Sequence, residues 1–195
     1  MVYEILREHN QKELNQKDAA RIATEVRDIP YALNADGNIK AIFEDRIAGC
    51  TRKHLYLLPR LKQLGYKVAI GLTDFDWRKL PIPDKVLSLL IDPIGYHMFL
   101  YYGFERAENV LDVTWDKGMQ HLGFPVFDWD GLSATGLTVE GSRTRKINRF
   151  VLQARSKAST IMGNINLKDQ SSPFNEPFNL WLAEARLTKG SNVIR

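Results

Sequence analysis

The spacing of apolar and polar positions predicts four helices and three strands along the chain. The first helix spans residues 11–29, and Pro30 ends it because proline lacks the N–H group that helical pairing needs. The second spans residues 50–64 and ends before Gly65, which stands where a left-handed C-cap belongs. Because Pro59 lies inside the second helix, a kink or an early break is expected there.

Three shorter stretches have the alternating pattern of β-strands, namely residues 67–73, 96–102 and 109–114. The last two are separated by only six residues, 103–108, which predicts a β-hairpin. Residues 74–95 are rich in proline, aspartate and glycine, and we expect a loop there with one further short element.

Two helical patterns follow an irregular stretch that runs to about Gly141. One spans residues 143–160, where the apolar positions share a single helix face. The other spans residues 176–187 and has Pro177 in its first turn, where proline is tolerated. Between them, the polar residues 163–173 predict a loop.

The predicted hairpin brings a histidine and an aspartate together. A turn centred between Phe104 and Glu105 pairs His97 with Asp112, and paired side chains of antiparallel strands share a face with β-carbons about 5 Å apart. At that separation a carboxylate can bind the imidazole, fix its tautomer and stabilise its protonated form. A register slip of one residue would put the two side chains on opposite faces instead.

Cys50 is the only cysteine of the chain, and it opens the second predicted helix. A thiol at a helix N-terminus lies at the positive end of the helix dipole, which favours the thiolate. Gly49 precedes it and allows a close approach of backbone or substrate. A lone cysteine is also a common inert core residue, so Cys50 alone does not identify a site.

Taken in order, the segments around Cys50, His97 and Asp112 resemble the transglutaminase-like superfamily over roughly residues 15–116. The segment Val26–Tyr31 is similar to the helix end that precedes the cysteine in that family. Ala48–Arg52 and Leu57–Val68 resemble the nucleophile helix and its following strand, Gly95–Leu100 the histidine strand, and Asn109–Trp115 the aspartate strand. Two positions depart from the pattern, because Met98-Phe99 stands where members often carry Ala-Trp and Val113 where a proline is common. Both departures bear on the shape of the acyl pocket.

The resemblance implies an α+β fold of papain-like arrangement, in which the nucleophile helix packs on an antiparallel sheet. The helical patterns after Gly141 add extra helices at the C-terminus. It implies a transglutaminase-like catalytic domain over residues 1–140. Residues 141–195 are then expected to form a C-terminal helical extension packed on the same domain.

The resemblance also implies an enzyme that uses Cys50 as nucleophile, His97 as base and Asp112 as the residue that orients the base. Such a triad forms a thioester acyl-enzyme with a peptide or protein substrate and needs no cofactor or metal. A peptidase or amidase is favoured, and a protein-glutamine transglutaminase that cross-links proteins is the alternative. A hypothesis of another class is a non-catalytic module that binds partners through the basic residues 141–168.

Other residues compete for the site or complete it. His54 lies one helical turn after Cys50 and is expected to pack or hydrogen-bond behind it, whereas His9 and His121 lie outside the predicted strands. The backbone N–H of Cys50 is a candidate oxyanion donor, and Asn34 is a guess for a second. Five aromatic residues could line a substrate cleft or belong to the core: Trp77, Phe99, Tyr101, Tyr102 and Trp115.

Composition adds little to this picture. The 195 residues, 44% hydrophobic and 26% charged, suit one soluble domain. A cytoplasmic protein without a membrane partner is expected, because a single cysteine needs no oxidising compartment and neither a signal-like start nor a membrane-spanning apolar run is visible.

Charge is uneven along the chain, because seven basic and no acidic residues lie between positions 141 and 168. These are Arg143, Arg145, Lys146, Arg149, Arg155, Lys157 and Lys168. Such a patch is either a solvated face or a surface for an acidic partner. Nucleic acid is not expected, since no aromatic residues interleave with these charges to stack on bases.

Overall fold

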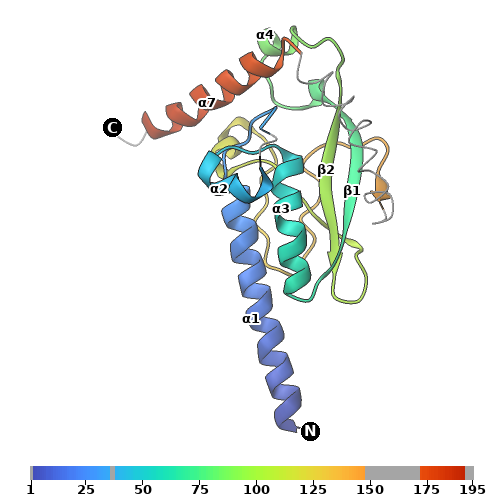
Figure 1. Ribbon diagram of the computed structural model, residues 1–195. Coiled ribbons are helices and arrows are strands. Elements are labelled where there is room, and N and C mark those ends of the chain that lie inside the picture. Colours follow the sequence, from blue (N-terminus) through green and yellow to red (C-terminus); the bar gives the residue numbers. More distant parts are fainter. Residues whose placement is uncertain (1, 36–37, 148–171, 192–195) are drawn as a thin grey trace.

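The computed structural model describes three stretches of the chain, residues 2–35, 38–147 and 172–191. Helix α1 spans Val2–Arg27 and helix α3 spans Cys50–Gln63. The two helices lie side by side, and α3 packs on the sheet (Figure 1). A 3-10 helix, η1 (Ile39–Ala41), and the short helix α2 (Ile42–Asp45) connect them.

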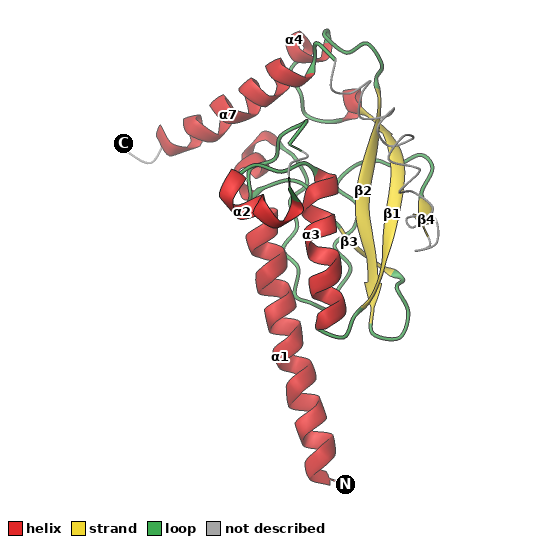
Figure 2. Ribbon diagram, in the orientation of Figure 1, coloured by secondary structure: helices red, strands yellow, loops and turns green. Residues whose placement is uncertain are grey.

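The sheet has four antiparallel strands in the order β3-β2-β1-β4 (Figure 2). Their bounds are β1 Lys67–Asp76, β2 Ile94–Gly103, β3 Asn109–Leu111 and β4 Arg145–Ile147. Strands β1 and β2 form the centre and pair along their full length, from Lys67 opposite Gly103 to Asp76 opposite Ile94. The expected α+β class with an antiparallel sheet is therefore confirmed.

Shorter elements surround this sheet. They are η2 (Trp77–Lys79), α4 (Asp84–Leu87) and η3 (Lys117–Leu122), and the last described helix is α7 (Asn175–Ser191). Helix α7 packs against η3 and lies at the same end of the molecule as α4 (Figure 1).

Helix α3 does not break at Pro59, so the expected early break is wrong. The proline removes one helical N–H donor. However, the fully buried side chains of Leu57 and Leu61 fix the helix on both sides of it. The predicted C-cap is confirmed, because Gly65 has φ +90° and the N–H groups of Gly65 and Tyr66 donate to the carbonyls of Lys62 and Leu61.

The prediction for residues 143–160 is wrong where the structure describes them. Arg145–Ile147 form strand β4 and pair with β1 through Gly71 and its neighbours. The edge of β1 offers unpaired backbone groups, and this pairing overrides a local helical pattern. Residues 148–160 and most of the predicted loop 163–173 lie outside the described residues, whereas the predicted helix 176–187 is confirmed as α7.

Two hydrophobic clusters form the core. One lies between α1, α3 and the sheet and includes Leu57, Leu61 and Leu100. The other, rich in aromatic residues, joins the end of β1 to η3 and α7. Cys50 packs against both clusters, so the start of α3 lies at their junction. No helix in the described stretches combines the length and apolarity needed to cross a membrane.

Candidate active site

Cys50 is the first residue of α3 and is partly exposed. Gly49 takes the N-cap position with an extended backbone, φ −77° and ψ 173°. The carbonyl of Gly49 accepts a 3.1 Å hydrogen bond from the N–H of Lys53 and so closes the first helical turn. The thiol therefore lies at the positive end of a helix, as the sequence predicts.

The loop before Cys50 is held by the buried side chain of Arg52. Its guanidinium donates to the carbonyls of Ile47, at 3.1 Å, and Asn38, at 2.6 Å, and pairs with Asp45. Arg52 is only 2% exposed, so these contacts replace the water that its charge has lost. They fix the path of the chain immediately before the cysteine.

The hairpin register differs from the predicted one by two residues. Leu100 pairs with Leu111 and Tyr102 with Asn109, so the same register, if extended, sets Asp112 across from Phe99 rather than His97. Because side chains alternate between faces with a period of two, an even slip keeps His97 and Asp112 on one face. The two side chains are diagonal neighbours, still within reach of each other.

His97 and Asp112 form a short, buried hydrogen bond. The Nε2–Oδ2 distance is 2.7 Å, and the residues are 2% and 1% exposed. Burial opposes protonation of the ring, but the Asp112 carboxylate and a hydrogen bond with Cys50 outweigh it and raise the pKa of His97 to about 10. Since Nε2 donates to Asp112, Nδ1 is the ring nitrogen left to serve Cys50. The structure thus brings the three predicted residues together.

Asp112 accepts five hydrogen bonds in a fully buried position. Oδ1 accepts from the N–H of Thr114 at 3.2 Å and from its hydroxyl at 2.7 Å. Oδ2 accepts from His97 and from the N–H and hydroxyl of Thr138, at 2.9 and 2.8 Å. Burial raises the pKa of this carboxyl, but the His97 charge and the hydrogen bonds outweigh it and hold the pKa well below its ordinary value.

Thr138 was missed by the sequence analysis. It lies 26 residues after Asp112, in a stretch without regular structure. No local pattern distinguishes it from the neighbouring threonines, and only the folded chain places it on the carboxylate.

His54 connects the cysteine to the aspartate segment from behind. Its Nδ1 lies 2.8 Å from the Cys50 carbonyl, and its Nε2 accepts a 3.1 Å hydrogen bond from the N–H of Val113. Because Nε2 accepts a hydrogen bond and Nδ1 faces a carbonyl, the ring proton is on Nδ1, which donates to the Cys50 carbonyl. Burial lowers the pKa of His54 to about 4, so the ring is neutral at pH 7 and its 3.6 Å approach to Asp112 is not an ion pair. The expectation that His54 hydrogen-bonds behind the site is confirmed.

Lys53 is a second residue that the sequence analysis missed. It is fully buried, and its Nζ donates to the carbonyls of Arg27 and Thr114, each at 2.8 Å. Burial lowers the pKa of this amine to about 7. The sequence does contain a signal for Lys53, because helical spacing places it on the same apolar face as Leu57 and Leu61. A charged residue on a buried face is unusual unless a polar partner binds it.

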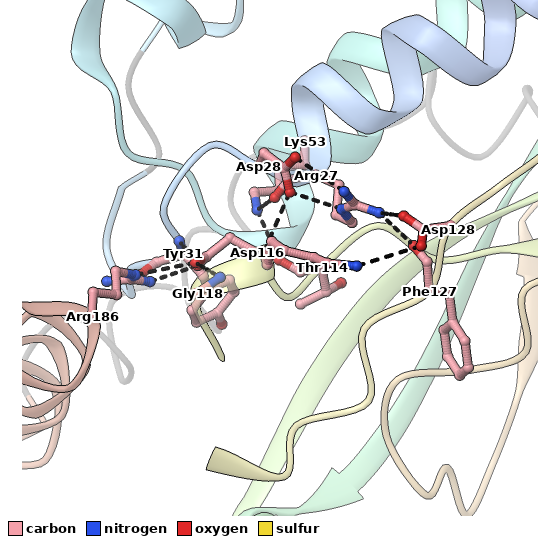
Figure 3. Close-up of polar contacts among 11 residues, drawn as sticks. Arg27, Asp28, Tyr31, Lys53, Thr114, Asp116, Gly118, Phe127, Asp128 and Arg186 are labelled. Atoms are coloured by element: carbon pink, nitrogen blue, oxygen red, sulfur yellow. Dashed lines mark hydrogen bonds and ion pairs between the residues drawn. The ribbon is translucent and has the colours of Figure 1, made fainter. Parts of the chain in front are cut away.

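Asp116 ties the C-terminal helix to the segment that follows Asp112 (Figure 3). Its carboxylate accepts from the N–H groups of Tyr31, at 2.9 Å, and Gly118, at 3.1 Å. Arg186 of α7 donates to the same carboxylate at 2.7 Å and to the Tyr31 carbonyl at 2.9 Å. Helix α7 is therefore joined both to the chain before Cys50 and to the chain after Asp112.

The remaining candidates lie away from this constellation or inside the core. Phe99, Tyr102 and Trp115 are at most 2% exposed and belong to the core, so they do not line a cleft. Tyr101 is half-buried beneath Lys146, whose Nζ is 5.2 Å from the ring centre, and Trp77 is 8% exposed. His9, His121 and Asn34 are exposed, and the role of Asn34 as an oxyanion donor remains a prediction.

Three of the seven basic residues lie in the described part of the chain: Arg143, Arg145 and Lys146. All three are exposed, and Lys146 also contacts the Ala107 carbonyl. Within the stretches that the structure describes, no group of three or more His, Cys, Asp or Glu residues could hold a metal ion.

Comparisons of this chain with models of protein families, with curated proteins and with solved structures find no match. A functional conclusion must therefore come from the chemistry of Cys50, His97 and Asp112 and their surroundings.

Proposed function

We propose that this chain is a cysteine-dependent amide hydrolase, a peptidase or amidase of papain-like arrangement within the transglutaminase-like superfamily. Cys50 is the nucleophile, His97 the acid and base, and Asp112 the residue that orients the imidazole. The observation that carries the proposal is the buried 2.7 Å hydrogen bond between His97 and Asp112, with Cys50 at the start of α3 near enough to help raise the pKa of His97.

The state of His97 suits this chemistry. With its pKa raised to about 10, the ring is an imidazolium at neutral pH, which is the partner that a Cys50 thiolate requires. The thiolate attacks the carbonyl carbon of an amide, and the S–C bond forms as the carbonyl π electrons move to oxygen. In this proposal the backbone N–H of Cys50, at the start of α3, donates to that oxyanion.

Acylation and deacylation then use the same imidazole. As the C–N bond breaks, His97 gives its proton to the leaving amine, and a thioester to Cys50 remains. In the second half, neutral His97 takes a proton from water as the water attacks the thioester. The C–S bond breaks, the carboxylic acid leaves, and Cys50 and His97 return to the thiolate–imidazolium pair.

The number of hydrogen-bond donors around the buried Asp112 carboxylate favours a catalytic site over a binding module. A buried ion pair is costly to desolvate, and a purely structural core gains as much from apolar residues. Here five donors keep the buried Asp112 carboxylate ionised. One of these donors is His97, which lies near the partly exposed thiol of Cys50. Buried groups whose pKa values are strongly shifted by a charged partner are typical of functional sites.

The acyl-enzyme provides a direct test. Wild type and Cys50→Ser are treated with p-nitrophenyl acetate, and the acetyl group is located by mass spectrometry. We expect an acetyl group on Cys50 that neutral hydroxylamine removes, as it does from thioesters, and none in Cys50→Ser. Adding glycine amide reports the acceptor, because hydrolysis releases acetate whereas transfer gives an acetylated amine. Failure to acylate Cys50, or acylation at an equal rate in His97→Ala, would overturn the proposal.

A further inference from the structure

Two consecutive residues of α3, Lys53 and His54, bind backbone groups of the two residues that follow Asp112, Val113 and Thr114. Lys53 donates to the carbonyl of Thr114 at 2.8 Å, and His54 accepts from the N–H of Val113 at 3.1 Å. Both residues are fully buried. The helix that carries the nucleophile is therefore fastened directly to the segment that carries the carboxylate.

We propose that Lys53 is a positioning residue of the triad, which holds the Asp112 segment at a fixed place relative to Cys50 through the Thr114 carbonyl. This inference rests on the proposed function, since it concerns the same three groups. Lys53 does not touch a substrate. It acts through Thr114, whose N–H and hydroxyl both donate to Oδ1 of Asp112.

The contacts form a closed ring. Hydrogen bonds run from Lys53 to Thr114, then to Asp112, then to His97. The ring is closed by the proximity of His97 to Cys50, which helps to raise the pKa of His97. The first and last members belong to a single turn of α3, in which the N–H of Lys53 binds the carbonyl of Gly49. Because one rigid helical turn carries both ends, loosening the Lys53 contact changes the separation of the imidazole and the thiol.

The second acceptor of Lys53 is the carbonyl of Arg27, at the C-terminal end of α1, where helix carbonyls lack intrahelical partners. Lys53 thus supplies two donors to two buried carbonyls. An apolar residue of the same length would leave both buried carbonyls without a hydrogen-bond donor, so the amine of Lys53 is needed and not only its apolar side-chain atoms. A neutral amine has two N–H groups, so the hydrogen bonds survive loss of its charge.

A double-mutant cycle separates positioning from general stability. The alkylation rate of Cys50 by iodoacetamide at pH 6 is measured by intact mass for wild type, Lys53→Met, His97→Ala and the double variant. We expect Lys53→Met to slow alkylation about tenfold or more in the wild-type background and to change it little in His97→Ala, because positioning matters only while the imidazole is present.

Tyr66→Phe is the matched control. It removes another buried hydrogen bond to a backbone carbonyl, from the Tyr66 hydroxyl to Gly131 at 2.7 Å, away from the triad. This variant should lose stability without a change in alkylation rate. Should Lys53→Met fail to fold, Lys53→Gln replaces it, since the amide keeps N–H donors, and a smaller rate loss is expected.

The outcomes separate the two proposals. Equal rate losses for the lysine variant in both backgrounds, or no loss in the wild-type background, would overturn the positioning role of Lys53 alone. A rate that His97→Ala leaves unchanged would overturn the proposed function itself.

Discussion

His97 and Asp112 meet at 2.7 Å although they are diagonal neighbours, not opposed residues, in the β2–β3 hairpin. The diagonal geometry leaves the carboxylate accessible to further donors, and Thr114 and Thr138 occupy that space. Two features keep the imidazole in place besides this bond. The Phe99 ring stacks beside it with ring centres 6.2 Å apart, and the Phe75 ring stands nearly perpendicular to it with ring centres 6.3 Å apart.

The proposed triad predicts that the reactivity of the Cys50 thiol depends on both His97 and Asp112. Alkylation of Cys50 by iodoacetamide at pH 6 should fall by about tenfold to a hundredfold in His97→Ala and in Asp112→Asn, because both changes remove the buried imidazolium. Intact mass spectrometry gives the rates without ambiguity, since Cys50 is the only thiol. Changing the exposed His121 to alanine is the matched control and should have no effect. A rate indifferent to both site substitutions would exclude the triad.

Thr138→Val tests the support of the carboxylate. The valine keeps the side-chain shape and the backbone N–H but removes the 2.8 Å hydroxyl bond to Asp112. We expect a loss of about 1–3 kcal/mol in the free energy of unfolding, because a buried carboxylate loses a donor. Urea denaturation measures the loss. The exposed Thr144 gives the control substitution, Thr144→Val, and a similar loss in the control would contradict the assignment.

Two buried groups link stability to alkaline pH with opposite signs. The pKa of His97 is raised from 6.5 to about 10, so its contribution is complete below pH 6.5 and is lost as the pH rises through 10. The pKa of Lys53 is lowered from 10.5 to about 7, so the unfolded chain binds the extra proton between these values and stability rises with pH. The two slopes oppose each other between pH 7 and 10.

Removing either group should expose the slope of the other. From pH 7 to 10 the free energy of unfolding should fall in Lys53→Met and rise in His97→Ala, by a few kcal/mol in each case, on the order expected for shifts of this size. Urea denaturation at a series of pH values measures the free energy of unfolding of both variants and of the wild type. The charged or titratable groups that act on Lys53 are Asp28, Cys50, Asp116 and Arg186. Parallel pH profiles for the two variants would refute the opposed linkage.

Arg186→Met tests whether α7 is integral to the domain. The substitution leaves the buried Asp116 carboxylate without its counter-ion, although the N–H groups of Tyr31 and Gly118 still bind it. We expect a loss of about 2 kcal/mol, less than for a fully buried pair because Arg186 is 20% exposed. The control is Arg78→Met, because the Arg78 side chain is 63% exposed in its pair with Asp76, and this change should cost less stability than Arg186→Met. Equal losses would show that α7 adds nothing through this contact.

Local rules accounted for the elements whose signals are contained in a few residues. Gly65 ends α3 because a left-handed residue is needed there, and Pro177 lies in the first turn of α7 because that turn requires no donor from it. The early break expected at Pro59 does not occur, because buried leucines hold the helix together, and the helix expected at Arg145–Ile147 is replaced by a strand that pairs with the available edge of β1.

For the candidate site, the sequence by itself determined the three reactive residue types, their order, and the face that His97 and Asp112 share, because strand alternation survives an even slip. Tertiary structure alone decided the hairpin register and the partners that come from distant parts of the chain. Lys53 reaches Thr114 across 61 residues and Thr138 reaches Asp112 across 26. Contacts of this kind satisfy buried polar groups wherever packing brings a donor near, and no local spacing encodes which donor that is.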